Sequence, residues 1–101
     1  MGKAILLDSG DNVATVTSEV AEGEVVEVLS PGGEVVQEPV ARGDVPFGHK
    51  LALVGFDRGD SVVKYGEVIG VASRAIAVGE WVHTHNLESA TVPTSAYGEA
   101  G

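Results

Sequence analysis

The sequence contains no cysteine among its 101 residues, which excludes disulfide bonds, thiolate zinc sites and cysteine nucleophiles. It also lacks a long apolar run. The first apolar stretch, Ile5–Leu7, is interrupted by Asp8, so neither a signal peptide nor a membrane span is expected. Together these absences predict one small cytoplasmic domain that has no membrane partner.

Basic residues are scarce, and most of them lie in one part of the chain. Six lysines and arginines stand against fifteen aspartates and glutamates, so the formal net charge is −9. Nucleic acid is therefore not an expected partner, because phosphate binding needs clustered cations. Five of the six basic residues fall between positions 42 and 74, which is where a small anion would bind. The N-terminal acids have a simpler interpretation: they keep a valine-rich domain soluble.

No segment shows a sustained apolar period of about 3.6 residues, so no long helix is expected. Short runs of valine and isoleucine are instead separated by Gly, Asp and Pro, which is typical of strands joined by turns. Ser30–Gly33 predicts a hairpin turn, and Ser61–Tyr65 predicts one helical turn capped by Asp60. We therefore expect a small all-β domain that is barrel-like or clip-like. The expected strands are Lys3–Leu7, Asn12–Thr17, Glu24–Leu29, Glu34–Glu38, Lys50–Val54, Val68–Ala72 and Trp81–His85.

A repeated phrase marks several of the turns. Val20–Glu24, Phe56–Asp60 and Ile76–Glu80 each read apolar–x–x–Gly–acid, and the glycine lets the chain turn sharply before a strand. The last residues, 93–101, are small and polar and have little apolar surface to bury. We therefore expect a domain over residues 1–92 and a flexible C-terminal tail.

The sharpest chemical pattern is Trp81–Asn86, which contains two of the three histidines. If this segment is extended, Trp81, His83 and His85 share one face, and the Cα atoms of the two histidines lie about 7 Å apart. Two imidazoles at that spacing can bind one divalent ion, and imidazole favours Fe, Mn or Zn. Asn86 and Glu88 follow closely and are candidate ligands or substrate contacts. The alternative is that both rings are half-exposed at a strand end and are hydrogen-bonded by backbone or water.

Two further segments carry candidate site residues. Pro46 and Gly48 predict a rigid turn that holds His49 in a defined place, where its imidazole can act as a base or a metal ligand. Lys64 can neutralise a carboxylate, and Tyr65 can bond a hydroxyl group. Taken separately, each segment also has an ordinary interpretation, as a turn histidine in the first case and a surface lysine beside a half-buried tyrosine in the second.

Four longer motifs occur in the order Asp11–Ala14, Asp44–Leu53, Val63–Gly70 and Gly79–Glu88. In sequence and in order they resemble the N-terminal region of the altronate and galactarate dehydratases, and the resemblance covers most of the chain. It implies a SAF domain with a β-clip fold, in agreement with the all-β expectation. Members of this family eliminate water from sugar acids with the help of a divalent metal. In the related sulfolactate sulfo-lyases, which eliminate sulfite, the same region is a separate small subunit.

The resemblance implies a hydro-lyase subunit that acts on a small anionic sugar acid with Fe²⁺ or Mn²⁺ as cofactor. Because the dehydratases continue into a much larger C-terminal region, the expected partner is a large dehydratase subunit, and the chain alone is expected to form a homo-oligomer. The implied site has His83 and His85 as metal ligands, His49 and Lys64 as catalytic residues, and Arg42, Lys50, Tyr65 and Asn86 as substrate contacts. Whether His49 serves as base, acid or third ligand stays open.

Three alternatives remain at this point. One is the small subunit of a sulfolactate sulfo-lyase. Another is a non-catalytic SAF module that binds carbohydrate or organises an assembly, since a fold alone does not determine a function. The third is a structural subunit whose histidines merely face the large subunit. The three histidines favour a catalytic role, because a domain that only packs against others has no need of them.

Overall fold

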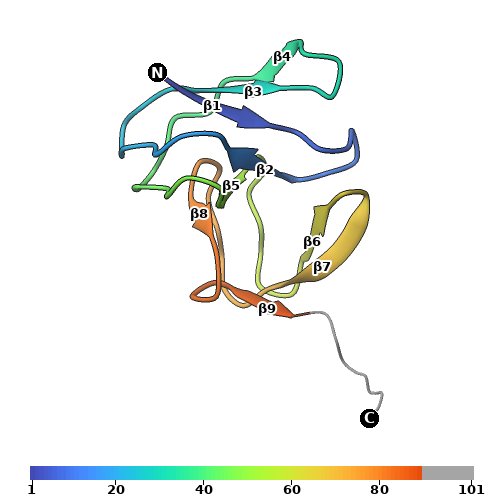
Figure 1. The fold of residues 1–101 in the computed structure, drawn as a ribbon. Helices are drawn as coiled ribbons and strands as arrows, with labels where there is room; N and C mark the ends of the chain where they lie inside the picture. The colour runs from blue at the N-terminus through green and yellow to red at the C-terminus, as the bar shows by residue number, and fades with distance from the viewer. Residues whose placement is uncertain (90–101) are drawn as a thin grey trace.

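A computed structural model describes residues 1–89 of the chain, and this part forms two β-sheets without any helix (Figure 1). The larger sheet has six strands in the order β4-β3-β1-β2-β5-β8, and the smaller has the order β6-β7-β9. The all-β expectation is confirmed, whereas the predicted tail lies outside the described residues. The strands are β1 Gly2–Ile5, β2 Val13–Val16, β3 Val26–Leu29, β4 Val35–Gln37, β5 Lys50–Ala52, β6 Ser61–Lys64, β7 Glu67–Ala72, β8 Trp81–Val82 and β9 Leu87–Ser89.

The sheets are mixed and their strands are short. Strands β1 and β3 pair in parallel, and every other pairing between named strands is antiparallel. The hairpin predicted at Ser30–Gly33 is confirmed, since the Gly33 N–H donates to the Ser30 carbonyl and β3 pairs with β4 across it. Within residues 1–89 no helix is long and apolar enough to cross a bilayer.

Two apolar clusters fill the interior, and β8 joins them. The first cluster includes Val16, Val28 and Leu51 of the larger sheet, and Trp81 packs against it. The second cluster includes Phe56 and also Val82 from β8. Adjacent residues of one short strand are thus anchored in different clusters. This fixes the direction in which β8 runs and therefore the place of the turn that follows it.

The helical turn predicted at Ser61–Tyr65 is wrong, because this segment is strand β6 and its connection to β7. Asp60 does not cap a helix; its carboxylate instead accepts a hydrogen bond from the Asp57 N–H at 2.8 Å and closes the preceding turn. Strands β6 and β7 are joined by Tyr65 and Gly66, both at positive φ (58° and 74°), as a two-residue hairpin loop requires.

The strand predicted over Trp81–His85 is also wrong in extent, because β8 ends at Val82 and residues 83–86 form a turn. The side chain of Asn86 causes the early ending. Its Oδ1 accepts the His83 N–H at 2.9 Å, while the Asn86 N–H donates to the His83 carbonyl at 3.0 Å. The alternation of faces on which the histidine spacing argument relied therefore stops before His83.

Asp11 and Asn12 attach the β6–β7 hairpin to the larger sheet. The Asp11 carboxylate, which is nearly buried, accepts the Tyr65 N–H at 3.0 Å and the Gly66 N–H at 2.8 Å. Asn12 accepts the Val63 N–H at 2.8 Å and donates to the Ser61 carbonyl at 3.0 Å. These bonds hold β6, and with it Lys64, beside the larger sheet.

Candidate functional site

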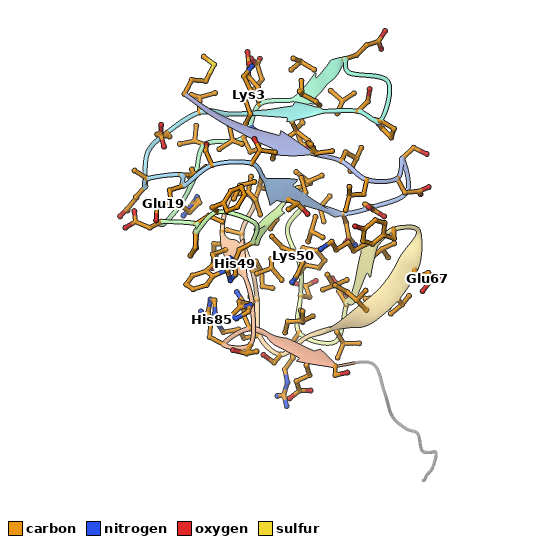
Figure 2. The ribbon with its side chains drawn as sticks, viewed as in Figure 1. Lys3, Glu19, His49, Lys50, Glu67 and His85 are labelled. Carbon is orange, nitrogen blue, oxygen red and sulfur yellow. The ribbon has the colours of Figure 1, made fainter. Side chains whose placement is uncertain are left out.

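All three histidines gather around the indole of Trp81 and form what we call the Trp81 cluster: Trp81, His49, His83 and His85. The ring of His83 stacks on the indole at 5.4 Å between centroids and 12° between planes. The rings of His85 and His49 contact it at 5.2 Å and 5.6 Å. Figure 2 shows His49 and His85 on one side of the molecule, with Lys50 toward its centre.

Strand pairing explains how residues far apart in the sequence meet in this cluster. Strand β5 pairs antiparallel with β8, so that Lys50 lies opposite Val82 and Leu51 opposite Trp81. His49 immediately precedes β5 and His83 immediately follows β8. Their rings are therefore brought to 5.0 Å between centroids, in an edge-to-face arrangement. A search for alternating residues along one strand does not reveal such a contact, because it depends on the pairing of two strands.

Asn86 holds the turn that carries His83 and His85. Its side chain is 0% exposed, and the amide Nδ2 donates to the Trp81 carbonyl at 2.9 Å while Oδ1 accepts the His83 N–H. The polar atoms of this side chain are thus occupied by backbone and shielded from solvent. In this geometry Asn86 positions the two imidazoles, and the substrate contact expected of it is not accessible.

The ring of His49 is oriented by its own turn. Its Nδ1 lies 3.1 Å from the Phe47 carbonyl oxygen, and a carbonyl oxygen can only accept. The hydrogen therefore sits on Nδ1, which leaves Nε2 of the neutral ring with a free lone pair. A histidine held in this way is suited to accept a proton or to bind a ligand through Nε2.

Two half-buried lysines, Lys50 and Lys64, lie near each other, and Lys50 directly follows His49 of the Trp81 cluster. Burial lowers the pKa of Lys50 on β5, and the positive charge of Lys64 on β6 lowers it further. Within residues 1–89 the ion pairs are Met1 with Glu24 and Lys3 with Glu27, so neither Lys50 nor Lys64 has a carboxylate partner. Two like charges that repel each other without a carboxylate between them would be stabilised by a bound anion.

The pKa of His83 depends on its burial and on its charged neighbours, among which is Lys50. Partial burial lowers its pKa, and the neighbouring charges of His49, Lys50 and His85 lower it further. The lowered pKa favours the neutral imidazole near pH 7, and the effect of the Lys50 charge places that lysine near His83. The fold therefore brings His49, Lys50 and His83 together.

The remaining predicted residues lie around this centre. Arg42 and His85 line a hollow of about 390 Å³ beside Trp81, together with Gly43, Asp44 and Glu80. Tyr65 is exposed, and the Lys64 ammonium lies 5.5 Å from its ring centroid. Glu88 is exposed on β9, opposite Val71 of β7. Another hollow, of about 320 Å³, is lined by Glu19, Glu24 and Asp44 and by no basic residue, so it is unsuited to an anion.

The described residues do not form a complete metal centre. Within residues 1–89 no group of three or more His, Asp or Glu side chains is placed to hold one ion. His83 and His85 each contact the indole of Trp81, so Trp81 is the group they share. A divalent ion at these imidazoles would need further ligands besides the side chains of residues 1–89.

Sequence reasoning missed the residues that organise the site. Trp81 was placed on a face with the histidines, but its role as the group on which all three rings meet depends on the β5–β8 pairing. Asp11 and Asn12 fix the position of Lys64 through hydrogen bonds to a hairpin that lies far from them in the sequence. The available signal was a polar pair placed directly before an apolar strand.

Comparison with known proteins places these residues in a known sequence family. The model for the altronate/galactarate dehydratase SAF domain matches residues 2–90. The altronate dehydratase of Bacillus subtilis is 35% identical over 89 residues, covering 88% of this chain and 17% of that protein. The chain thus spans about one sixth of that relative.

Shorter relatives are matched over most of their length. The (2R)-sulfolactate sulfo-lyase subunit alpha of Chromohalobacter salexigens is 32% identical over 89 residues, covering 84% of this chain and 92% of that subunit. The subunit of the same name from Paracoccus pantotrophus is 47% identical over 49 residues, covering 48% of this chain and 73% of that subunit.

Proposed function

Because the chain belongs to the altronate/galactarate dehydratase SAF-domain family, we propose that it is the small subunit of a lyase that eliminates water from a sugar acid. The observation that carries this proposal is the set of three histidines that share Trp81, with Lys50 next to them and Lys64 near Lys50. The all-β architecture agrees with the SAF β-clip fold of the family.

In this proposal the lysine pair binds the substrate carboxylate. Removing a proton from the carbon next to a carboxylate builds a second negative charge at the same end of the molecule. Two ammonium groups already in place stabilise that charge without reorganisation. Binding the anion also relieves the repulsion between Lys50 and Lys64. Arg42, on the His85 side of Trp81, is placed to contact a more distant part of the substrate.

The histidines move protons. A neutral imidazole, His49 or His83, takes the proton from the carbon next to the carboxylate. The C–O bond at the following carbon then breaks, and the departing hydroxyl takes up a proton and leaves as water. The resulting enol tautomerises to a 2-keto-3-deoxy acid. The lowered pKa of His83 keeps that ring in the form able to accept a proton.

We further propose that a divalent Fe²⁺ or Mn²⁺ ion binds His83 and His85 in the assembled enzyme, with its other ligands supplied by the large subunit. Such an ion would act as a Lewis acid toward the substrate oxygens. No step described for the lysines and histidines of this chain depends on it.

A partner chain is part of the proposal, because the site residues lie in shallow or exposed positions. His85 is exposed, whereas pockets that hold small ligands bury most of the ligand surface. We propose that a large dehydratase subunit closes the site in the cytoplasm, and that the chain forms a homo-oligomer when expressed alone. The absence of cysteine fits that compartment.

The second candidate is the corresponding subunit of a sulfolactate sulfo-lyase. It is favoured by the coverage of 92% of one such subunit, against 17% of an altronate dehydratase. The same lysines and histidines serve both reactions, since both remove a leaving group from the carbon next to one that bears an acidic proton. The two candidates differ in whether water or sulfite leaves.

Reconstitution tests this proposal. The isolated chain, supplied with Fe²⁺ or Mn²⁺, should show negligible elimination from altronate, galactarate or sulfolactate. Addition of a large dehydratase subunit should produce a 2-keto acid, and the substrate that reacts identifies the leaving group. Full turnover by the isolated chain would show that the site is complete within it. An assembly that forms but stays inactive on all three acids would favour the non-catalytic SAF module.

A further inference from the structure

Four turns of the protein share one backbone geometry: Val20–Glu24, Val45–His49, Phe56–Asp60 and Ile76–Glu80. Each begins at a buried apolar residue on an isolated bridge, with Val20 paired to Val45 and Phe56 paired to Ile76. Each has glycine in fourth place, at φ of 90°, 81°, 93° and 92° in chain order. In each, the N–H of the fifth residue donates to the carbonyl of the second, at 3.0, 3.1, 3.0 and 3.1 Å.

Three of these turns are capped by the side chain of their fifth residue. The carboxylates of Glu24, Asp60 and Glu80 accept the N–H of the second residue of their turns, at 2.7, 2.8 and 2.8 Å. The same bond occurs in two other turns, where the N–H groups of Asp8 and His83 donate to the side-chain oxygens of Asp11 and Asn86. The side-chain cap is thus a recurrent device by which this small domain closes its turns.

The turn at Val45–His49 lacks both halves of that cap. Its second residue is Pro46, which has no N–H to donate, so a carboxylate in fifth place would find no partner there. Its fifth residue is His49, whose ring bonds the Phe47 carbonyl and contacts Trp81 and His83. Among the four turns, the exception is the one that carries a site residue.

We propose that the Val45–His49 turn is a fourth copy of the capped turn in which the capping carboxylate has been exchanged for an imidazole, so that Nε2 of His49 is presented to the ligand in the Trp81 cluster. Pro46 has a defined part in this arrangement: it removes the donor that the cap would use and fixes φ at the second position of the turn. The ligand is the hydroxy acid of the proposed function, and that part of the inference rests on it.

The exchange can be tested by measuring the free energy of unfolding of variants at positions 46 and 49. Pro46→Ala restores the missing donor and His49→Glu restores the acceptor, so the two changes should be favourably coupled. Urea unfolding of the two single variants gives the factor by which each change alters the unfolding equilibrium constant. If the two changes were independent, these factors would multiply in the double variant; we expect its constant to be about three- to tenfold smaller than that product. As a matched control, Asp60→His performs the reverse exchange in a sister turn and should raise that constant roughly tenfold. If the effects of Pro46→Ala and His49→Glu on the free energy of unfolding simply add, the proposed exchange of cap for imidazole is wrong.

Nitrogen NMR of the His49 ring tests the other half of the proposal. At a pH where the ring is neutral, Nδ1 should be protonated and Nε2 free, and galactarate as the probe should shift Nε2. Protonation at Nε2 instead of Nδ1 would contradict the proposed role of Nε2. The same holds if galactarate shifts the resonance of the Lys50 ammonium but leaves the nitrogen resonances of the His49 ring unchanged. Unfolding and tautomer do not depend on turnover, so they can fail or succeed separately from the lyase assignment.

Discussion

Replacement of His83 by alanine in the assembled enzyme should lower kcat/KM by about 100-fold or more, which is the usual contribution of a positioned acid–base group. The ring stacks on Trp81, lies 5.0 Å from the His49 ring and has a lowered pKa. Because the side chain is only half-buried and its backbone bonds do not involve the ring, the free energy of unfolding should change by less than about 1 kcal/mol.

Thr84→Ala is the matched control for this prediction, since Thr84 lies in the same turn and is exposed. It should leave both kcat/KM and stability unchanged. His85→Ala should also reduce activity without unfolding the domain. If His83→Ala were as active as the unmodified enzyme, the histidines would be bystanders. A parallel loss of stability and activity would instead make the ring a structural element.

Asn86→Ala should lower the free energy of unfolding by about 2–4 kcal/mol, which is a large effect for a single side chain. The side chain is completely buried, and its removal leaves the His83 N–H and the Trp81 carbonyl without their present partner. Two partly buried polar groups without partners carry a desolvation cost that fully exposed groups would not. Urea unfolding of the isolated chain measures the change.

Asn86→Asp separates the two possible roles of this residue. It keeps an acceptor for the His83 N–H but places an oxygen against the Trp81 carbonyl, so it too should destabilise the domain. If Asn86→Ala leaves stability unchanged but weakens substrate binding, Asn86 contacts the substrate, as expected from the sequence, and the positioning role is wrong.

The strands were largely predictable, and the errors share one cause. A valine-rich run before a glycine turn predicted β3, whose side chains alternate between buried and partly exposed positions. The errors at Ser61–Tyr65 and Trp81–His85 both came from a polar side chain that closes a turn three residues back. Local patterns do not distinguish such a cap from a helix start or from the continuation of a strand.

The site was predictable in its residue types and only partly in its arrangement. Histidine and lysine in an acidic chain predicted an anion-binding centre, and the structure brings His49, Lys50 and His83 together. The proximity of Lys50 and Lys64 could not be predicted from the sequence, because it depends on the hydrogen bonds by which Asp11 and Asn12 hold the β6–β7 hairpin. Arg42, by contrast, lies on the His85 side of Trp81.

The central claim is that the Trp81 cluster and the lysine pair form half of a lyase site that a second chain completes. Trp81 is the single tryptophan, so incorporation of 5-fluorotryptophan into this chain alone gives one fluorine resonance at the site. That resonance should shift when the large subunit binds and shift again when the reactive hydroxy acid is added. The second shift should disappear in a Lys50→Met, Lys64→Met variant that still assembles. If the assembly is active but its fluorine resonance does not shift when the substrate is added, the account is contradicted, because turnover then occurs away from Trp81.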